Sequence, residues 1–171
     1  MRRLLAVLGA VMLAGSLASS GVAAEPLGQP DMFVGASGDW TYVPVPAGFT
    51  IRTAGNTTFI EGTEVSTFTG TFEGTSSDAF VVVCHQKGSD SVTNFVKGTV
   101  AFTGTVDGRA GELTMGFRGK QESTTCDPSG AIWSGTWVVI GGSGDLTDLH
   151  GHGTWTGPSF DLDYTGQIHF R

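Results

Sequence analysis

The sequence predicts an all-β domain whose strands close into a barrel, and three observations support this prediction. After the first two dozen residues no segment shows a helical hydrophobic period, whereas several segments alternate apolar and polar residues with a period of two. Threonine, which favours strands, is abundant. The chain also contains 27 glycines, many of them inside predicted strands, where they are typical of a tightly coiled barrel wall rather than an open sandwich.

Strand alternation is clearest at the end of the chain. Apolar and polar residues alternate over 160–170, so that one face of this strand is buried and the other is wet. The segments 100–106 and 113–118 show the same period, and the Asp-Gly turn between them predicts a tight hairpin. Further strands, which bring the total to eight or nine, are predicted at 38–45, 56–61, 65–73, 79–87, 131–140 and 148–156, with turn-rich segments at 74–78 and 141–145.

The N-terminus has the three parts of a secretory signal peptide. Two arginines precede an apolar run from Leu4 to about Leu17, and small residues stand at Val22 and Ala24. A membrane anchor, the alternative interpretation, needs roughly 20 apolar residues, whereas this run is shorter and is broken by glycines. The predicted organisation is a signal peptide at 1–24, an extended or disordered lead-in at 25–37 and one β-barrel domain at 38–171.

The mature chain is therefore expected outside the cytoplasm, with no integral membrane segment after cleavage. Its length suits one domain with a sizeable core. The sequence has 9 basic and 16 acidic side chains, and loss of Arg2 and Arg3 with the signal would change the net charge from −7 to −9. Such acidity repels phosphate backbones and anionic membrane surfaces. Nucleic-acid binding is the function class that the composition excludes most readily.

The two cysteines, Cys84 and Cys126, both lie in the exported part, where an oxidising environment lets a disulfide persist. In the chain-entropy model, closing a loop of this length stabilises a fold by about 4 kcal/mol. The alternative, a catalytic thiolate paired with His85, conflicts with strand geometry because adjacent residues point to opposite faces. We therefore predict a Cys84–Cys126 disulfide.

Four glycine- and threonine-rich segments follow one another along the chain. They are FTGTFEG at 68–74, FTGTVDGRAG at 102–111, GSGDLTDLHGHGT at 142–154 and DLDY at 161–164. Their order resembles the allene oxide cyclase barrel-like superfamily, which includes the dirigent proteins, and more narrowly its bacterial secreted members of unassigned function. The resemblance covers most of 38–170.

The resemblance implies an eight-stranded antiparallel barrel that holds a small apolar molecule and uses no metal or redox cofactor. Plant allene oxide cyclases and the dirigent proteins that guide radical coupling both act in this way. The matched motifs consist of turn and strand glycines, so a set of catalytic residues does not carry over to this chain. The two cysteines, and the tryptophans Trp133 and Trp137, depart from the pattern.

A ligand inside a barrel would be oriented by a few inward polar groups. The candidates are Glu73, His85, Arg118 and Tyr164, which all lie on predicted strands, although each is also compatible with an ordinary solvated or core position. A carboxylate in an apolar lumen has a raised pKa and can act as a general base. This is the cyclase-like hypothesis for Glu73.

One alternative constellation is a facial metal set formed by Asp148, His150 and His152, which fall at i, i+2 and i+4 of a strand. Because their glycine neighbours fit the barrel motif and their positions suit solvent, we predict neither a metal site nor a cofactor. The primary functional prediction is binding of a small apolar or aromatic ligand in the lumen. The alternatives are a cofactor-free isomerase or cyclase and a structural or partner-binding protein with a filled barrel. Formation of a homo-oligomer is compatible with the sequence.

Overall fold

The computed structural model describes residues 32–88, 91–127 and 132–171, so the predicted signal peptide lies outside the described part. Apart from one short 3-10 turn, η1 (Pro46–Gly48), the elements are strands. The described part of the chain contains no helix that is long and apolar enough to cross a membrane. The strands are β1 (Val34–Pro44), β2 (Thr50–Ala54), β3 (Thr57–Phe68), β4 (Phe72–Gln86), β5 (Val92–Val106), β6 (Arg109–Ser123), β7 (Ile132–Gly144), β8 (Leu149–Pro158) and β9 (Asp161–Phe170).

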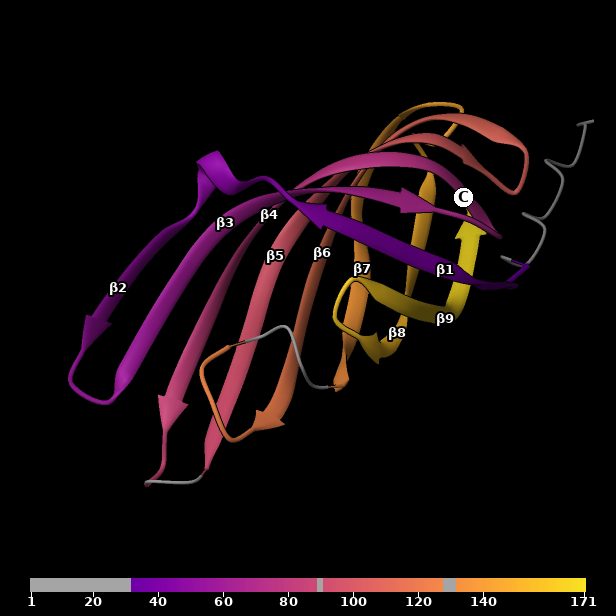
Figure 1. Cartoon of the computed structure of the whole chain (residues 1–171). Coiled ribbons are helices and arrows are strands. Elements are labelled where there is room, and N and C mark those ends of the chain that lie inside the picture. Colours follow the sequence, from indigo (N-terminus) through magenta and orange to yellow (C-terminus); the bar gives the residue numbers. More distant parts are fainter. Residues whose placement is uncertain (1–31, 89–90, 128–131) are drawn as a thin grey trace, which may run out of the picture.

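All nine strands belong to one antiparallel sheet, which confirms the predicted all-β class. The strand order is β1-β9-β8-β7-β6-β5-β4-β3-β2, and β1 also pairs with β3. Because β1 has β9 on one side and the second half of β3 on the other, eight strands follow one another in a ring of pairings. The short β2 pairs with the first half of β3 and lies beside this ring (Figure 1).

The predicted hairpin between the two central strands is confirmed. Asp107 and Gly108 both have positive φ, 50° and 78°, as a two-residue turn that matches the strand twist requires. Val106 and Arg109 pair directly across the turn, and the β5–β6 ladder then continues to Val92 and Ser123. The period-two pattern at the end of the chain is also confirmed, since β9 buries alternate residues.

Two predicted boundaries are wrong. The segment 74–78, read as a turn because of its Gly, Ser, Thr and Asp residues, lies inside β4. Its polar side chains Ser76 and Asp78 are buried and face polar partners on β3, so composition was a poor guide here. The turn instead falls at 69–71, inside the predicted strand 65–73, where Gly70 adopts φ 96°.

Two further boundaries shift by a few residues. β1 begins at Val34, inside the expected lead-in 25–37, because the backbone of 34–37 pairs with the end of β9. β7 runs on to Gly144, so that most of the predicted turn 141–145 belongs to a strand. Residues 145–148 make this turn instead.

The inner face of the curved sheet carries the core, and one half of it is densely filled with aromatic rings. Phe72 packs edge-on against Trp137 with ring centroids 5.5 Å apart, and against Tyr164 at 5.3 Å. The Tyr164 hydroxyl donates a hydrogen bond to the Thr69 carbonyl oxygen at 2.9 Å and accepts one from the Phe72 amide at 2.9 Å. These contacts fasten β9 to the turn between β3 and β4.

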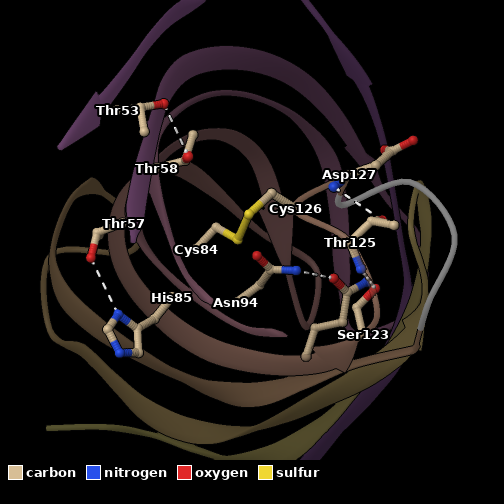
Figure 2. Close-up of a disulfide and its surroundings, with 11 residues drawn as sticks. Thr53, Thr57, Thr58, Cys84, His85, Asn94, Ser123, Thr125, Cys126 and Asp127 are labelled. Carbon is tan, nitrogen blue, oxygen red and sulfur yellow. Dashed lines mark hydrogen bonds between the residues drawn. A yellow bond between two sulfur atoms is a disulfide. The ribbon is translucent and has the colours of Figure 1, made fainter. Parts of the chain in front are cut away.

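The predicted disulfide between Cys84 and Cys126 is present. Cys84 lies on β4 and is fully buried, and Cys126 follows β6, so the bridge spans the intervening β5. Figure 2 shows Asn94 of β5 beside the bridge, where its amide donates to the Gln121 side chain at 2.9 Å. The disulfide therefore holds the segment after β6 against the inner face of β4 and β5.

Candidate functional site

A cavity of about 190 Å³ lies on the inner face of the sheet, on the other side of the core from Phe72. Its floor includes Trp40 and Phe117, whose ring centroids are 5.3 Å apart in an edge-on arrangement and which also border the filled half. Phe160 at its rim is 43 % exposed, so the cavity opens toward solvent there. Its lining consists of Trp40, Tyr42, Pro44, Phe49, Ile60, Glu64, Phe80, Val82, Val96, Phe117, Trp133, Trp155, Ser159, Phe160 and Leu162.

Glycines make room for one wall of this cavity. The Trp155 ring lies directly over Gly119 of β6 and Gly135 of β7, and a Cβ atom at either position would collide with the ring. The indole nitrogen of Trp155 donates to the Thr136 carbonyl oxygen at 3.2 Å. The mid-strand glycines therefore allow a large aromatic side chain to lie flat against the sheet and form a wall.

Among the described residues, Glu64 is the one acidic residue in the lining. The Glu64 side chain points inward because alternate residues of a strand face the same side. Glu64 lies four positions from Ile60 and four from Phe68, which are both buried. Only 7 % of the residue is exposed. Burial, together with like-charge repulsion from the nearby Asp78 carboxyl, raises the pKa of the Glu64 carboxyl to about 8. Glu64 is therefore largely protonated at neutral pH.

Asp78 lies directly opposite Glu64 in the β3–β4 ladder and belongs to a buried polar chain. The Trp40 indole nitrogen donates to the Ser66 hydroxyl at 3.0 Å, and this hydroxyl donates a short hydrogen bond to one Asp78 carboxyl oxygen. The other Asp78 oxygen, Oδ1, has no hydrogen-bond partner among the described residues. Burial raises the pKa of Asp78, although the Ser66 hydrogen bond opposes the shift.

A second polar group lies on the opposite side of the cavity. The Trp133 indole nitrogen donates to the Ser159 hydroxyl at 3.1 Å. The Tyr42 phenol interacts with Ser159 and with the Phe160 backbone, and its pKa is raised by burial and also by the charge of Glu64. The cavity thus combines mostly apolar walls with a carboxyl, a phenol and a hydroxyl, which is the usual composition of a ligand pocket.

Of the four residues predicted to face a lumen, Tyr164 alone is buried. It is 2 % exposed and lies in the filled half of the core rather than in the lining of the cavity. Glu73, His85 and Arg118 are all exposed, and the structure does not bring the four together. His85 points away from the disulfide in Figure 2, where its Nδ1 lies 3.2 Å from the Thr57 hydroxyl.

Arg118 instead belongs to a broad groove of about 950 Å³ on the outer face of β4 to β9. Its Nε donates to the Thr136 hydroxyl at 3.4 Å, and Lys97 and Lys120 also line the groove. The groove has a larger volume than the inner cavity, but these basic side chains are exposed. Buried and directed polar groups are found in the inner cavity, which we therefore take as the candidate site.

Within the described ranges, no group of three or more His, Cys, Asp or Glu side chains is placed to hold a metal ion. Asp148, His150 and His152, considered above as a facial set, are all exposed. The His150 ring instead stacks on His169 of β9 with centroids 5.3 Å apart.

Sequence reasoning missed Glu64 and Asp78. A usable signal existed in β3, because Glu64 and Ser66 share the period-two phase of Ile60 and Phe68 and must face the core with them. No comparable signal existed for Asp78, which lies in the polar segment interpreted as a turn. Only the pairing of β3 with β4 brings the two carboxyls together.

Comparison with known proteins identifies a family of unknown function. A search of curated proteins finds no match. Among solved structures, a crystal structure of a protein with unknown function from Shewanella oneidensis MR-1, of the DUF3224 family, is similar with a TM-score of 0.56. The two chains are 17 % identical, and the match covers 82 % of this chain and 98 % of that one, a likeness that shows the fold alone. The sequence profile of the DUF3224 family, whose description is protein of unknown function, matches residues 38–165. The chain therefore belongs to the DUF3224 family.

Proposed function

We propose that this protein is an exported β-barrel that binds a small apolar or aromatic molecule in the inner cavity beside Glu64. The observation that carries the proposal is a cavity of about 190 Å³ with mostly apolar walls and a few directed polar groups. An engineered apolar cavity of about 150 Å³ is large enough to bind benzene. A ligand with one ring, or of similar bulk, is therefore the size we expect.

The barrel in this proposal is of the allene oxide cyclase-like type. Support comes from the eight strands that pair in a ring, with β1 between β9 and β3, and from the glycine-rich motifs of the sequence. Export is supported by the signal-like residues 1–24 and by the disulfide, since disulfides persist in oxidising compartments.

A barrel filled by its own side chains is the alternative that the geometry favours less. The half of the interior around Phe72 and Trp137 leaves only about 10 Å³ of space, as that alternative requires. The other half of the interior is not filled in this way, because the cavity above Trp40 and Phe117 remains open. We infer that the filled half supports the fold and that the open half serves the ligand.

A second candidate function is a cofactor-free isomerase or cyclase. The observation in its favour is the Glu64 carboxyl, whose pKa of about 8 keeps it protonated at neutral pH and able to act as a general acid. Glu64 would donate its proton to an epoxide oxygen as one C–O bond breaks. The resulting carboxylate would take a proton from the neighbouring carbon as a C=C bond forms, so that the epoxide becomes an allylic alcohol and no atom is gained or lost. Product analysis after incubation with unsaturated epoxides separates this function from binding alone.

Tryptophan fluorescence tests the binding proposal, because Trp40, Trp133 and Trp155 line the cavity. The probes are small aromatic and alicyclic molecules such as phenol and cyclohexanol. Val96→Phe, at a half-buried lining position, should fill the cavity and abolish the response. Val43→Phe makes the same change on the outer face, where Val43 is 70 % exposed, and should leave the response intact. Equal responses from the two variants, or none from the unaltered protein across a diverse panel, would refute the proposal.

A further inference from the structure

Glu64 in the cavity lining and Asp78 beside it are buried carboxyls with no positively charged partner among the described residues. Glu64 and Asp78 are 7 % and 1 % exposed, and no basic residue lines the cavity beside them. Every lysine and arginine in the described part of the chain is exposed, and the two remaining arginines, Arg2 and Arg3, lie in the predicted signal peptide. The exposed basic residues are Arg52, Lys87, Lys97, Arg109, Arg118, Lys120 and Arg171.

Buried carboxyls in proteins are usually paired with a positive group or kept neutral by a bound proton. Here none of the described residues supplies such a group to Glu64, and no hydrogen bond to a described residue satisfies Asp78 Oδ1. A ligand that carried a positive charge into the cavity would replace the proton on Glu64. The carboxyl pair thus favours cationic ligands over neutral or anionic ones.

The walls of the cavity favour the same ligand chemistry. Eight of its fifteen lining residues are aromatic, and the negative faces of aromatic rings attract cations, most strongly when the site is shielded from water. Aromatic cages of this kind recognise alkylated ammonium groups in other proteins. The aromatic lining residues are Trp40, Tyr42, Phe49, Phe80, Phe117, Trp133, Trp155 and Phe160.

We propose that the ligand of the cavity is a small alkylated ammonium ion, surrounded by the aromatic side chains and neutralised by the Glu64 carboxylate, with Asp78 as the cross-strand neighbour of Glu64 adding negative charge. This inference rests on the proposed binding function of the inner cavity and adds a positive charge to the apolar ligand proposed there. A cation of about the bulk of choline suits a cavity of about 190 Å³.

The proposal has a defined pH dependence. The titratable groups that face Glu64 are Asp78 across the β3–β4 ladder and the Tyr42 phenol of β1. Burial and the Asp78 carboxyl raise the pKa of Glu64 to about 8, so the carboxylate forms only as the pH approaches that value. A cation binds the carboxylate form, and its affinity should therefore rise by about tenfold or more between pH 6 and pH 8. A neutral molecule of the same shape should not show this rise.

The experiment compares choline with 3,3-dimethylbutan-1-ol, which has the same shape without the charge. Dissociation constants are measured by calorimetry and tryptophan fluorescence at pH 6 and pH 8 on the mature protein. At pH 8 choline should bind at least tenfold more tightly than the alcohol. Glu64→Gln should remove this preference, because the change weakens binding of choline far more than binding of the alcohol. Glu61→Gln, the control at an exposed position of the same strand, should behave as the unaltered protein.

The outcomes separate the two proposals. If the alcohol binds as tightly as choline, or if choline affinity is independent of pH, the cation proposal is wrong and the binding function stands. If neither probe binds and the wider panel is also silent, both fail. The ratio of the two affinities in the unaltered protein decides the matter even if Glu64→Gln does not fold.

Discussion

The carboxyl groups of Glu64 and Asp78 occupy directly opposed positions on β3 and β4, both on the buried face of the sheet. Like charges in such cross-strand pairs are destabilising, and burial alone already disfavours each carboxylate. The folded protein therefore holds Glu64 in its protonated form at neutral pH. The proton on Glu64 therefore affects both the free energy of unfolding and the charge of the cavity lining.

Glu64 should make stability fall as the pH rises. Its pKa is about 8 in the folded protein against 4.5 as the ordinary value, so the folded state binds the extra proton between these limits. Its stabilising contribution is complete below pH 4.5 and is lost as the pH rises through about 8. At about 1.4 kcal/mol per pH unit, the interval corresponds to at most roughly 5 kcal/mol. Asp78, whose pKa is also raised, acts in the same direction.

Glu64→Gln isolates this effect, because glutamine keeps the size of the side chain without titrating. We expect the variant to be more stable than the unaltered protein at pH 8.5, and this advantage to shrink toward pH 5. Urea unfolding across this range measures the difference. Glu61→Gln serves as the exposed control and should track the unaltered protein. Parallel curves for all three proteins would contradict the buried position of Glu64.

Tyr164→Phe should weaken the fold and leave ligand binding intact. The change removes the hydroxyl that bridges the Thr69 carbonyl oxygen and the buried Phe72 amide. An unsatisfied buried group costs about 1–3 kcal/mol, which chemical unfolding resolves. Loss of ligand response without loss of stability would instead return Tyr164 to the site that the sequence suggested for it.

Loss of the disulfide should destabilise the fold substantially. Cys84 and Cys126 are separated by 42 positions, and the chain-entropy model gives about 4 kcal/mol for a loop of this length. Unfolding of the Cys84→Ala/Cys126→Ala double variant, compared with the oxidised protein, measures the difference. A midpoint within error of the oxidised protein would show that the bridge does not constrain the unfolded chain as this model requires.

Gly70→Ala should be costly for two reasons. Gly70 has φ 96°, a conformation that L-residues with side chains rarely adopt, and an added methyl group would collide with the Ser37 carbonyl oxygen of β1. We expect a loss of about 2 kcal/mol or more. Gly35→Ala is the matched control in β1, because an added Cβ there meets nothing within 4 Å. Similar thermal midpoints for the two variants would count against the close approach of this turn to β1.

The parts of the fold that the sequence predicted well are those with local signals. The β5–β6 hairpin follows from its Asp-Gly turn and its flanking alternation, and β9 follows from strict period two. The segment 74–78 was misread because Ser76 and Asp78 are buried by partners on β3, and composition contains no trace of that pairing. In this segment polar composition did not indicate a turn, because β3 offers polar partners to Ser76 and Asp78.

The candidate site was harder to predict, because it depends on closure of the sheet. Glu73 lies on the predicted strand 65–73 and Glu64 between the predicted strands 56–61 and 65–73, yet Glu73 is exposed whereas Glu64 lies inside β3 and lines the cavity. Which face of each strand lies inside follows from the whole register of pairings. The open half of the core arises where Trp40 meets Phe117 and Trp155, contacts between strands that are distant in sequence.

The proposed binding requires open space on the inner face of the sheet beside Glu64. Crystallography under xenon pressure tests for this space most directly, since xenon enters apolar cavities of this size. We expect one xenon site between Trp40, Val96 and Phe117, on the inner face and beside Glu64. Val96→Phe should eliminate this site, whereas Val43→Phe should not. Side chains that fill this volume, with no xenon bound there, would contradict the account.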